Sequence, residues 1–238
     1  MNNSSSDFIP YYVPDISDSE IKRVVECLRS GWLTTGPVCK EFEKEFSKIF
    51  EEGVEAVSVN SATSGLHLCL TAIGVTTGDE VITTVHTFTA TAEVIRYLGA
   101  DPVFADIDPE TLCIDHRSIE SLITDKTKAI IPVHFGGHSA NLLAINSIAK
   151  KYNIHVIEDA AHALPCTFKG KLIGDNTSTA TVFSFYANKT MTTGEGGMIT
   201  TKDNDLLKKM KIYRTHGISR DSFDRFRSKS PAWYYQVV

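Results

Sequence analysis

The segment FSFYANKTMTTGEGG, which runs from Phe183 to Gly197, begins in an apolar run and ends in a glycine-rich turn. The residues around its start, from Thr179 to Phe185, are mostly β-branched or aromatic and predict a buried strand. Lys189 follows this strand and is surrounded by threonine and glycine rather than by other charges. Most lysines are solvated, but a lysine in this context can lose its proton and act as a nucleophile.

A second strand end lies about thirty residues earlier, where the apolar run HVI leads into EDAAH. Asp159 in this run is either the N-cap of a following helix or a ligand for a nitrogen heterocycle, and both interpretations have equal weight when it is taken alone. A carboxylate beside a ring nitrogen keeps that nitrogen protonated, and the presence of Lys189 favours this second role. His162 either caps or packs, or it joins the same site.

A third strand end lies in VSVNSATSGLHL, from Val57 to Leu68, which predicts a strand, a turn of small residues and the start of a helix. Free backbone N–H groups and hydroxyls converge at such a point, so this turn is a candidate for holding an anion. Simple capping by serine or threonine is the more frequent alternative. Ser184, at the end of the strand before Lys189, offers a further hydroxyl.

A fourth strand end, from Val85 to Ala92, places Phe88 at the edge of the sheet. Its ring either packs in the core or stacks on a flat cofactor. His86, His134 and His138 show no spacing typical of metal ligands, so we expect no metal site. The five cysteines are scattered and odd in number, which favours reduced thiols over disulfides.

The chain as a whole alternates short β-rich runs with helical segments. This alternation predicts an α/β fold, with a mostly parallel mixed sheet between helices and ligands bound at the carboxyl ends of the strands. Two amphipathic helices are expected first, Ser17 to Ser30 and Val38 to Phe50. The other expected helices are Gly65–Ile73, Ala90–Leu98 and Leu142–Tyr152, and the expected strands are Ala56–Val59, Glu80–Val85, Pro102–Ile107, Ala129–His134, His155–Ile157 and Thr179–Phe185.

Composition excludes several classes of protein. The 238 residues are 42% hydrophobic and carry a net charge of −5 without a basic stripe, so nucleic acid is not an expected partner. The sequence contains no run of roughly 18 apolar residues, so we expect no membrane span. The polar start MNNSSS lacks the apolar core of a secretory signal, which makes the cytoplasm the expected location.

Taken together and in order, these motifs resemble the DegT/DnrJ/EryC1/StrS family of sugar aminotransferases, within the fold type I superfamily that uses pyridoxal 5′-phosphate (PLP). The resemblance extends over nearly the whole chain, and the segments that carry it are GWLTTGP from Gly31, NSATSGLH from Asn60, GDEVI from Gly78, TFTATA from Thr87, EDAAHA from Glu158, and FSF with Lys189 and GEGG from Phe183.

The resemblance implies a role for each candidate residue. Lys189 would bond covalently to PLP and move the proton during transfer, and Asp159 would pair with the pyridinium nitrogen. Phe88 would stack on the ring, and His162 would lie near its phenolic oxygen. The phosphate would rest on Ala62, Thr63 and Ser184. Weaker candidates for the substrate side are Trp32, Thr34 and Thr35, although core packing and turn chemistry explain these three nearly as well.

The implied reaction transfers an amino group, usually from glutamate, to a keto carbon of a nucleotide-linked deoxysugar, for glycan, lipopolysaccharide or antibiotic sugar biosynthesis. Family members that act as dehydratases carry histidine in place of this lysine, so Lys189 favours transamination; a PLP lyase or dehydratase acting on amino acids is a further alternative. The resemblance also implies a homodimer.

The expected division of the chain is an N-terminal helical segment, residues 1–50, and a PLP-binding large domain, residues 51–238. The small C-terminal domain of the family is expected to be absent, because WYYQVV, from Trp233 to Val238, resembles the segment just before the family's Gly-Tyr-Asn-Tyr-Arg motif. A catalytically inactive PLP-binding remnant, or a partner subunit, is therefore the alternative to an active enzyme.

Overall fold

A computed structural model describes residues 8–175, 177–219, 222–227, 231 and 235–238. The helices are α1 (Asp18–Arg29), α2 (Pro37–Ser47), α3 (Ala62–Ala72), α4 (Thr89–Tyr97), α5 (His116–Ile119), α6 (Leu142–Tyr152), α7 (Asn204–Tyr213) and α8 (Ser222–Arg227). The strands are β1 (Glu55–Val59), β2 (Glu80–Thr84), β3 (Asp101–Ala105), β4 (Thr127–Ile130), β5 (His155–Asp159), β6 (Thr167–Phe168), β7 (Lys171–Leu172), β8 (Ala180–Ser184) and β9 (Gly197–Thr201).

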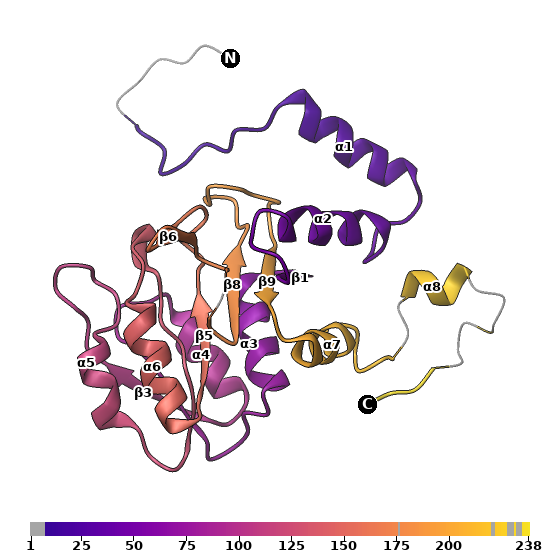
Figure 1. Cartoon of the computed structure of the whole chain (residues 1–238). Coiled ribbons are helices and arrows are strands. Elements are labelled where there is room, and N and C mark those ends of the chain that lie inside the picture. The colour runs from indigo at the N-terminus through magenta and orange to yellow at the C-terminus, as the bar shows by residue number, and fades with distance from the viewer. Residues whose placement is uncertain (1–7, 176, 220–221, 228–230, 232–234) are drawn as a thin grey trace.

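Seven strands form one sheet in the order β1-β9-β8-β5-β4-β2-β3 (Figure 1). The neighbouring pairs are parallel except that β9 is antiparallel to both β1 and β8. The prediction of an α/β fold with a mostly parallel mixed sheet between helices is therefore confirmed. The carboxyl ends of the parallel strands share one edge of the sheet, which is where ligands bind in such folds.

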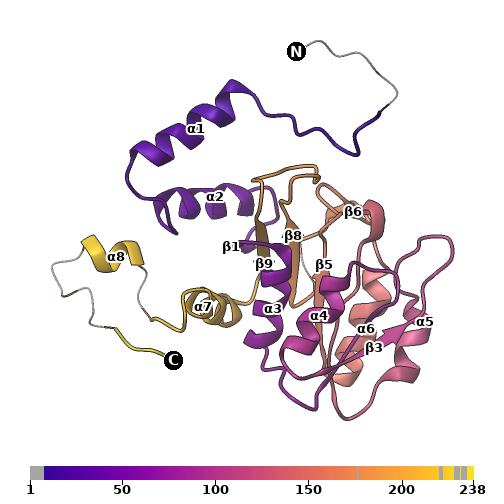
Figure 2. The same cartoon turned by 180° about the vertical axis from the view of Figure 1, so that it is seen from behind.

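The strands are apolar on both faces because helices cover both faces. Along β8, Val182 packs in a cluster with α3, α4 and α7, while the next residue, Phe183, packs in a cluster with α2. Figures 1 and 2 show α3 and α4 on the face opposite α6. Val156 of β5 joins a third cluster, on the α6 side. Alternation along each strand thus builds a three-layer domain around the sheet.

Helix α2 is attached to the sheet through a buried ion pair as well as through aromatic packing. Its Glu43 is 8% exposed and accepts hydrogen bonds from the backbone N–H (2.9 Å) and the hydroxyl (2.7 Å) of Ser58 in β1. Arg214, just after α7, donates to the same carboxylate and to the Ser58 carbonyl at 3.0 Å. Three segments distant in sequence are therefore held at one point, which fixes α2 beside β1.

Helix α1 lies apart from the sheet, beyond its carboxyl edge, together with the extended residues that precede it (Figure 1). Ser17 and Glu20 form a capping box at its start, as serine at this position predicts. Its apolar residues Ile21, Val24 and Leu28 are all more than half exposed. In the described part of the chain no helix is both long and apolar enough to cross a membrane.

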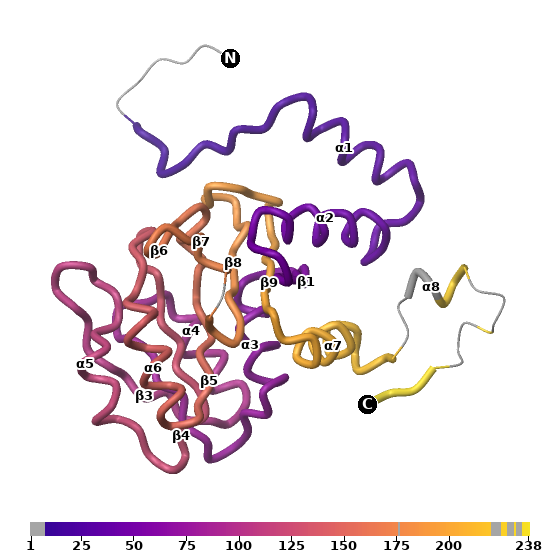
Figure 3. Tube along the Cα trace, in the orientation of Figure 1, coloured from indigo at the N-terminus to yellow at the C-terminus, as the bar shows by residue number. Residues whose placement is uncertain are grey.

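The expected elements are confirmed with a few shifts of boundary. The helix expected from Gly65 starts at Ala62, because Ser61 is its N-cap. The strand expected to reach His134 ends at Ile130, since Pro132 lacks the N–H that continues a ladder. Strand β9 and helix α7 were not among the expected elements. The tube in Figure 3 lets both be followed beside β8 and α3.

Candidate active site

Lys189 lies in a turn just beyond the carboxyl end of β8, where its N–H donates to the Tyr186 carbonyl at 2.9 Å. Its side chain lines a cavity of about 380 Å³ together with Tyr11, Phe135, Gly136, Ala161, His162, Leu164, Ser184, Asn188, Thr190 and Met191. Burial lowers the pKa of the Lys189 amine, and the negative charge of Asp159 acts in the opposite direction. A lowered pKa increases the fraction of neutral, nucleophilic amine near pH 7.

Asp159 ends β5 and is 5% exposed. The Thr91 hydroxyl donates to its Oδ2 at 2.8 Å, and the Ala161 N–H donates to its Oδ1 at 3.1 Å. Thr91 in turn shares a hydrogen bond of 2.7 Å with Thr87, which lies just before the N-cap of α4. The carboxylate is therefore held in one orientation by α4 and by its own following turn, and each oxygen keeps capacity for another donor.

His162 lies close enough to both charged groups to feel them. Burial and the neighbouring Lys189 lower the pKa of its imidazole, while Asp159 works against them. Its Nδ1 accepts a long hydrogen bond of 3.4 Å from the Gly136 N–H, and the Phe135 ring lies edge-on at 5.9 Å between centroids. The structure thus brings Lys189, Asp159 and His162 together, as expected from their places at strand ends.

The candidate anion seat is built where three segments converge on Gly197. In the sheet, Gly197 pairs with Ser184 on one side and with Val59 on the other. A Cβ on Gly197 would lie 2.8 Å from the Ala62 nitrogen, so only glycine lets β9 come this close to the start of α3. The first N–H groups of α3, on Ala62 and Thr63, have no partner within the helix and point outward from its positive end.

Replacing Gly197 by alanine is expected to lower the free energy of unfolding by about 1–3 kcal/mol, because the new methyl group meets rigid backbone atoms. It should also weaken the binding of an anion at this seat by moving the N-terminus of α3 away from Ser184. Thermal unfolding and a titration with inorganic phosphate measure the two effects. Gly196→Ala is the matched control, since its methyl group meets a side-chain atom, the Thr193 hydroxyl, which can rotate away. Equal effects of the two substitutions would contradict this account.

The remaining candidates lie elsewhere. Phe88 is the N-cap residue of α4 and is 77% exposed, so its ring is free to cover a flat ligand. Trp32, Thr34 and Thr35 line a larger cavity of about 1280 Å³, which is distinct from the cavity of Lys189. The segment from Phe185 to Gly197 contributes residues to both cavities. The structure therefore separates the proposed substrate residues from the lysine by this segment.

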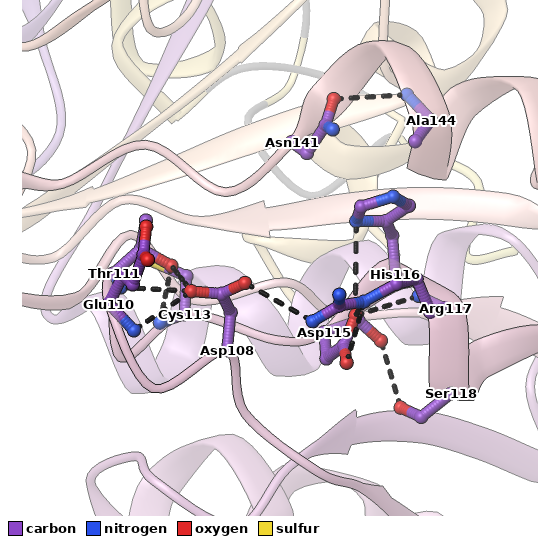
Figure 4. A network of polar contacts seen from close by, with 10 residues as sticks. All are labelled: Asp108, Glu110, Thr111, Cys113, Asp115, His116, Arg117, Ser118, Asn141 and Ala144. Carbon is purple, nitrogen blue, oxygen red and sulfur yellow. Dashed lines mark hydrogen bonds and ion pairs between the residues drawn. The ribbon is translucent and has the colours of Figure 1, made fainter.

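A polar network fixes the loop between β3 and α5, outside the cavity of Lys189 (Figure 4). Asp108 accepts from the Thr111 N–H at 3.1 Å, and Arg117 reaches both Asp108 (3.4 Å) and Asp115 (2.8 Å). Backbone N–H donors lower the pKa of Asp108, and Arg117 lowers the pKa of Asp115. The charged groups of this network pair with one another. The same loop places the Cys113 thiol 3.3 Å from the His138 carbonyl oxygen, to which it donates.

The sequence-based interpretation missed Thr91, His134 and Gly136. Thr91 gave no usable signal, because its hydroxyl partner Thr87 precedes the N-cap Phe88 and the four-residue spacing of the two threonines is therefore not a helical repeat. His134 and Gly136 gave no local signal, since their contacts are with distant residues. In the described residues no group of His, Cys, Asp or Glu is arranged to hold a metal ion.

The model of the DegT/DnrJ/EryC1/StrS aminotransferase family matches residues 14–237. This chain belongs to that family. The spore coat polysaccharide biosynthesis protein SpsC of Bacillus subtilis is 48% identical over 97% of the chain and 58% of its own length. The UDP-4-amino-4-deoxy-L-arabinose–oxoglutarate aminotransferase of Shewanella sediminis is 47% identical over 93% of the chain and 56% of its own length.

Solved aminotransferase structures share the fold. Spr1654 from Streptococcus pneumoniae, assigned as a sugar aminotransferase, matches in its form with pyridoxamine phosphate (PMP) with a TM-score of 0.85 and 37% identity. That match covers 97% of this chain and 62% of Spr1654, and the PLP form of the same protein gives a TM-score of 0.84. PLP is thus the cofactor of this family. The chain spans somewhat less than two thirds of the length of these relatives.

Proposed function

We propose that this chain binds PLP and forms the cofactor site of an aminotransferase, which transfers an amino group from glutamate to the keto group of a nucleotide-linked deoxysugar. The observation that carries the proposal is the half-buried Lys189, whose amine lies in one cavity with His162 and within electrostatic reach of the buried Asp159. A nucleophilic amine, a buried carboxylate and an imidazole are the groups that PLP chemistry requires from a protein.

The surroundings of Lys189 fit the cofactor. Lys189 would hold PLP covalently through its side-chain amine, and the same amine would be the proton-transfer base. Asp159, held by Thr91 and Ala161, would accept the hydrogen bond of the protonated ring nitrogen. When bound, PLP supplies the electron sink that stabilises negative charge on the amino-bearing carbon.

The ends of the cofactor would be held by separate parts of the chain. The close approach of β9 to α3 at Gly197 supports a phosphate seat made of Ala62, Thr63 and Ser184. The exposed ring of Phe88 would cover one face of the pyridine ring. His162 would lie near the phenolic oxygen, kept neutral by burial and by Lys189, which both lower its pKa.

The larger cavity supports the substrate part of the proposal. Its volume of about 1280 Å³ and its lining by Trp32, Thr34 and Thr35 suit a sugar linked to a nucleotide. The names of the relatives in the family, spore coat polysaccharide and aminoarabinose proteins, support a role in glycan or lipopolysaccharide synthesis. The second of these names includes oxoglutarate, the keto acid that remains when glutamate gives up its amino group, and this supports glutamate as the donor.

The proposal includes a homodimer in the cytoplasm and a division between residues 1–50 and 51–238. The exposed apolar residues of α1, Ile21, Val24 and Leu28, support a partner surface near the N-terminal segment. The attachment of α2 to β1 through Glu43 supports a stable contact between the two parts. Sedimentation velocity of the purified chain tests this, because a dimer sediments with twice the mass of one chain and a monomer contradicts the proposal.

The function is tested by adding PLP to the purified chain and then adding glutamate. We expect a visible absorption band on mixing with PLP, loss of that band with glutamate, and oxoglutarate in equal molar amount to the cofactor consumed. If the band is unchanged by glutamate but is lost with another amino acid, that amino acid is the donor in place of glutamate. If no band forms, the chain is an inactive remnant or a partner subunit, and the aminotransferase proposal fails for this polypeptide.

A further inference from the structure

His134 and Glu158 form a buried pair directly beneath the candidate site. Their side chains are 0% and 1% exposed, and His134 Nε2 lies 2.9 Å from Glu158 Oε2. Glu158 precedes Asp159 on β5, so its side chain leaves the opposite face of the strand. The other carboxylate oxygen, Oε1, is buried and has no hydrogen-bond partner among the described residues. Neither residue is used by the proposed chemistry.

The hydrogen bonds define the tautomer of His134. Its Nδ1 accepts the Ala140 N–H at 3.1 Å, so this nitrogen carries no proton. The ring proton is therefore on Nε2 and is donated to Glu158. The pair is a hydrogen bond between a neutral imidazole and a carboxyl group, not an ion pair, although its atoms lie within ion-pair distance.

The same residue anchors the loop that reaches the site. The His134 N–H donates to the Asp159 carbonyl at 3.0 Å, and the Asp159 N–H donates to the Pro132 carbonyl at 2.9 Å. The next two residues both contact His162. The Phe135 ring packs edge-on against its imidazole, and the Gly136 N–H donates to its Nδ1. The His134 ring accepts the Ala140 N–H at one nitrogen and donates to Glu158 from the other, so this ring joins the two ends of the loop and attaches them to β5.

We propose that the His134–Glu158 hydrogen bond is a positioning device, which holds the loop from Phe135 to Gly137 against His162 and so sets the tautomer and orientation of that imidazole beside Lys189. The N–H of Gly136 can meet Nδ1 only when Nδ1 is unprotonated, which leaves the His162 proton on Nε2. The relevance of this orientation to catalysis rests on the proposed PLP site. The positioning itself is a property of the chain without cofactor.

The test is histidine NMR of the full chain without PLP, with ¹⁵N-labelled imidazoles. In the wild type we expect His134 and His162 to be protonated on Nε2 at pH 7, and His162 to titrate below its ordinary pKa, about 6.5. The charged groups that face His162 are Lys189 and Asp159, and neither is changed in the variants. Glu158→Ala should move the His162 pKa upward toward its ordinary value and mix its tautomers, because the loop is no longer held.

Glu158→Gln is the conservative variant, since its amide oxygen can still accept the His134 proton, and it should restore the His162 pKa and tautomer. His138→Ala is the matched control in the same loop, because this ring is exposed and its removal should leave His162 unchanged. The inference is overturned if Glu158→Ala lowers stability without altering His162, or if Gln behaves like Ala. A doubly protonated His134 in the wild type would overturn it without any variant. Failure of the PLP absorption test would affect the proposed function and leave these readouts intact.

Discussion

Lys189→Ala is expected to abolish the covalent attachment of PLP and to lower amino transfer by at least about 10⁴-fold, because one side chain supplies both the nucleophile and the proton-transfer base. The attachment should also depend on pH in a defined direction. The amine reacts when it is neutral, so attachment becomes faster as the pH rises through the pKa of Lys189. Burial lowers this pKa, and the midpoint should therefore lie below the ordinary value of about 10.4.

Two measurements check this expectation. Borohydride treatment of the wild type with PLP should fix one cofactor per chain on the peptide that contains Lys189, as read by mass spectrometry, and stopped-flow absorbance gives the pH dependence. Lys208→Ala is the matched control, because this side chain is 72% exposed on α7. Attachment to another lysine in the Lys189→Ala variant, or a midpoint above 10.4, would contradict the assignment.

Asp159→Asn is expected to lower amino transfer by on the order of 10²–10³-fold, the size of effect known for the loss of one preorganised electrostatic contact in an active site. The substitution keeps the size of the side chain and an acceptor for the Thr91 hydroxyl, but it removes the negative charge. Because Asp159 raises the pKa of Lys189 and of His162, its neutralisation should lower both. The fold should be retained, since the amide still fills the same place.

Single-turnover kinetics with glutamate measure the rate, and the pH dependence of PLP attachment reports the shift at Lys189. Asp205→Asn is the control for loss of one negative charge, because Asp205 is 89% exposed on α7. A normal rate in Asp159→Asn would remove this residue from the site. An upward shift of the Lys189 pKa would show that Asp159 is not its electrostatic neighbour.

Much of the fold could be predicted because it depends on local patterns. Short apolar runs that alternate with helical segments indicate βαβ units and a parallel sheet. The strands expected from such runs at β1, β5 and β8 are present. Strand β9 was missed for a physical reason. Its run GMITT directly follows a glycine-rich turn, and it is a strand because β1 and β8 offer hydrogen-bonding edges on both of its sides.

In the candidate site, too, residues with a local sequence signal could be predicted, and residues whose roles depend on distant partners could not. Lys189 and Asp159 could be named because each lies at, or within a few residues of, the end of an apolar run, and the carboxyl ends of parallel strands share an edge. Thr91 and the His134–Glu158 pair could not, because their roles depend on hydrogen bonds across 68 and 24 positions of sequence. Nothing in the local sequence of either residue indicates these partners.

Local sequence therefore determined which residues end the strands and which chemistry they can perform, since propensity and periodicity act over a few neighbouring residues. Tertiary structure alone decided their environment: the burial that lowers the pKa of Lys189, the clamp of Thr91 on Asp159, and the approach of β9 to α3 at Gly197. Such effects arise only when segments distant in sequence pack together, because desolvation and hydrogen-bond geometry depend on every group that surrounds a site.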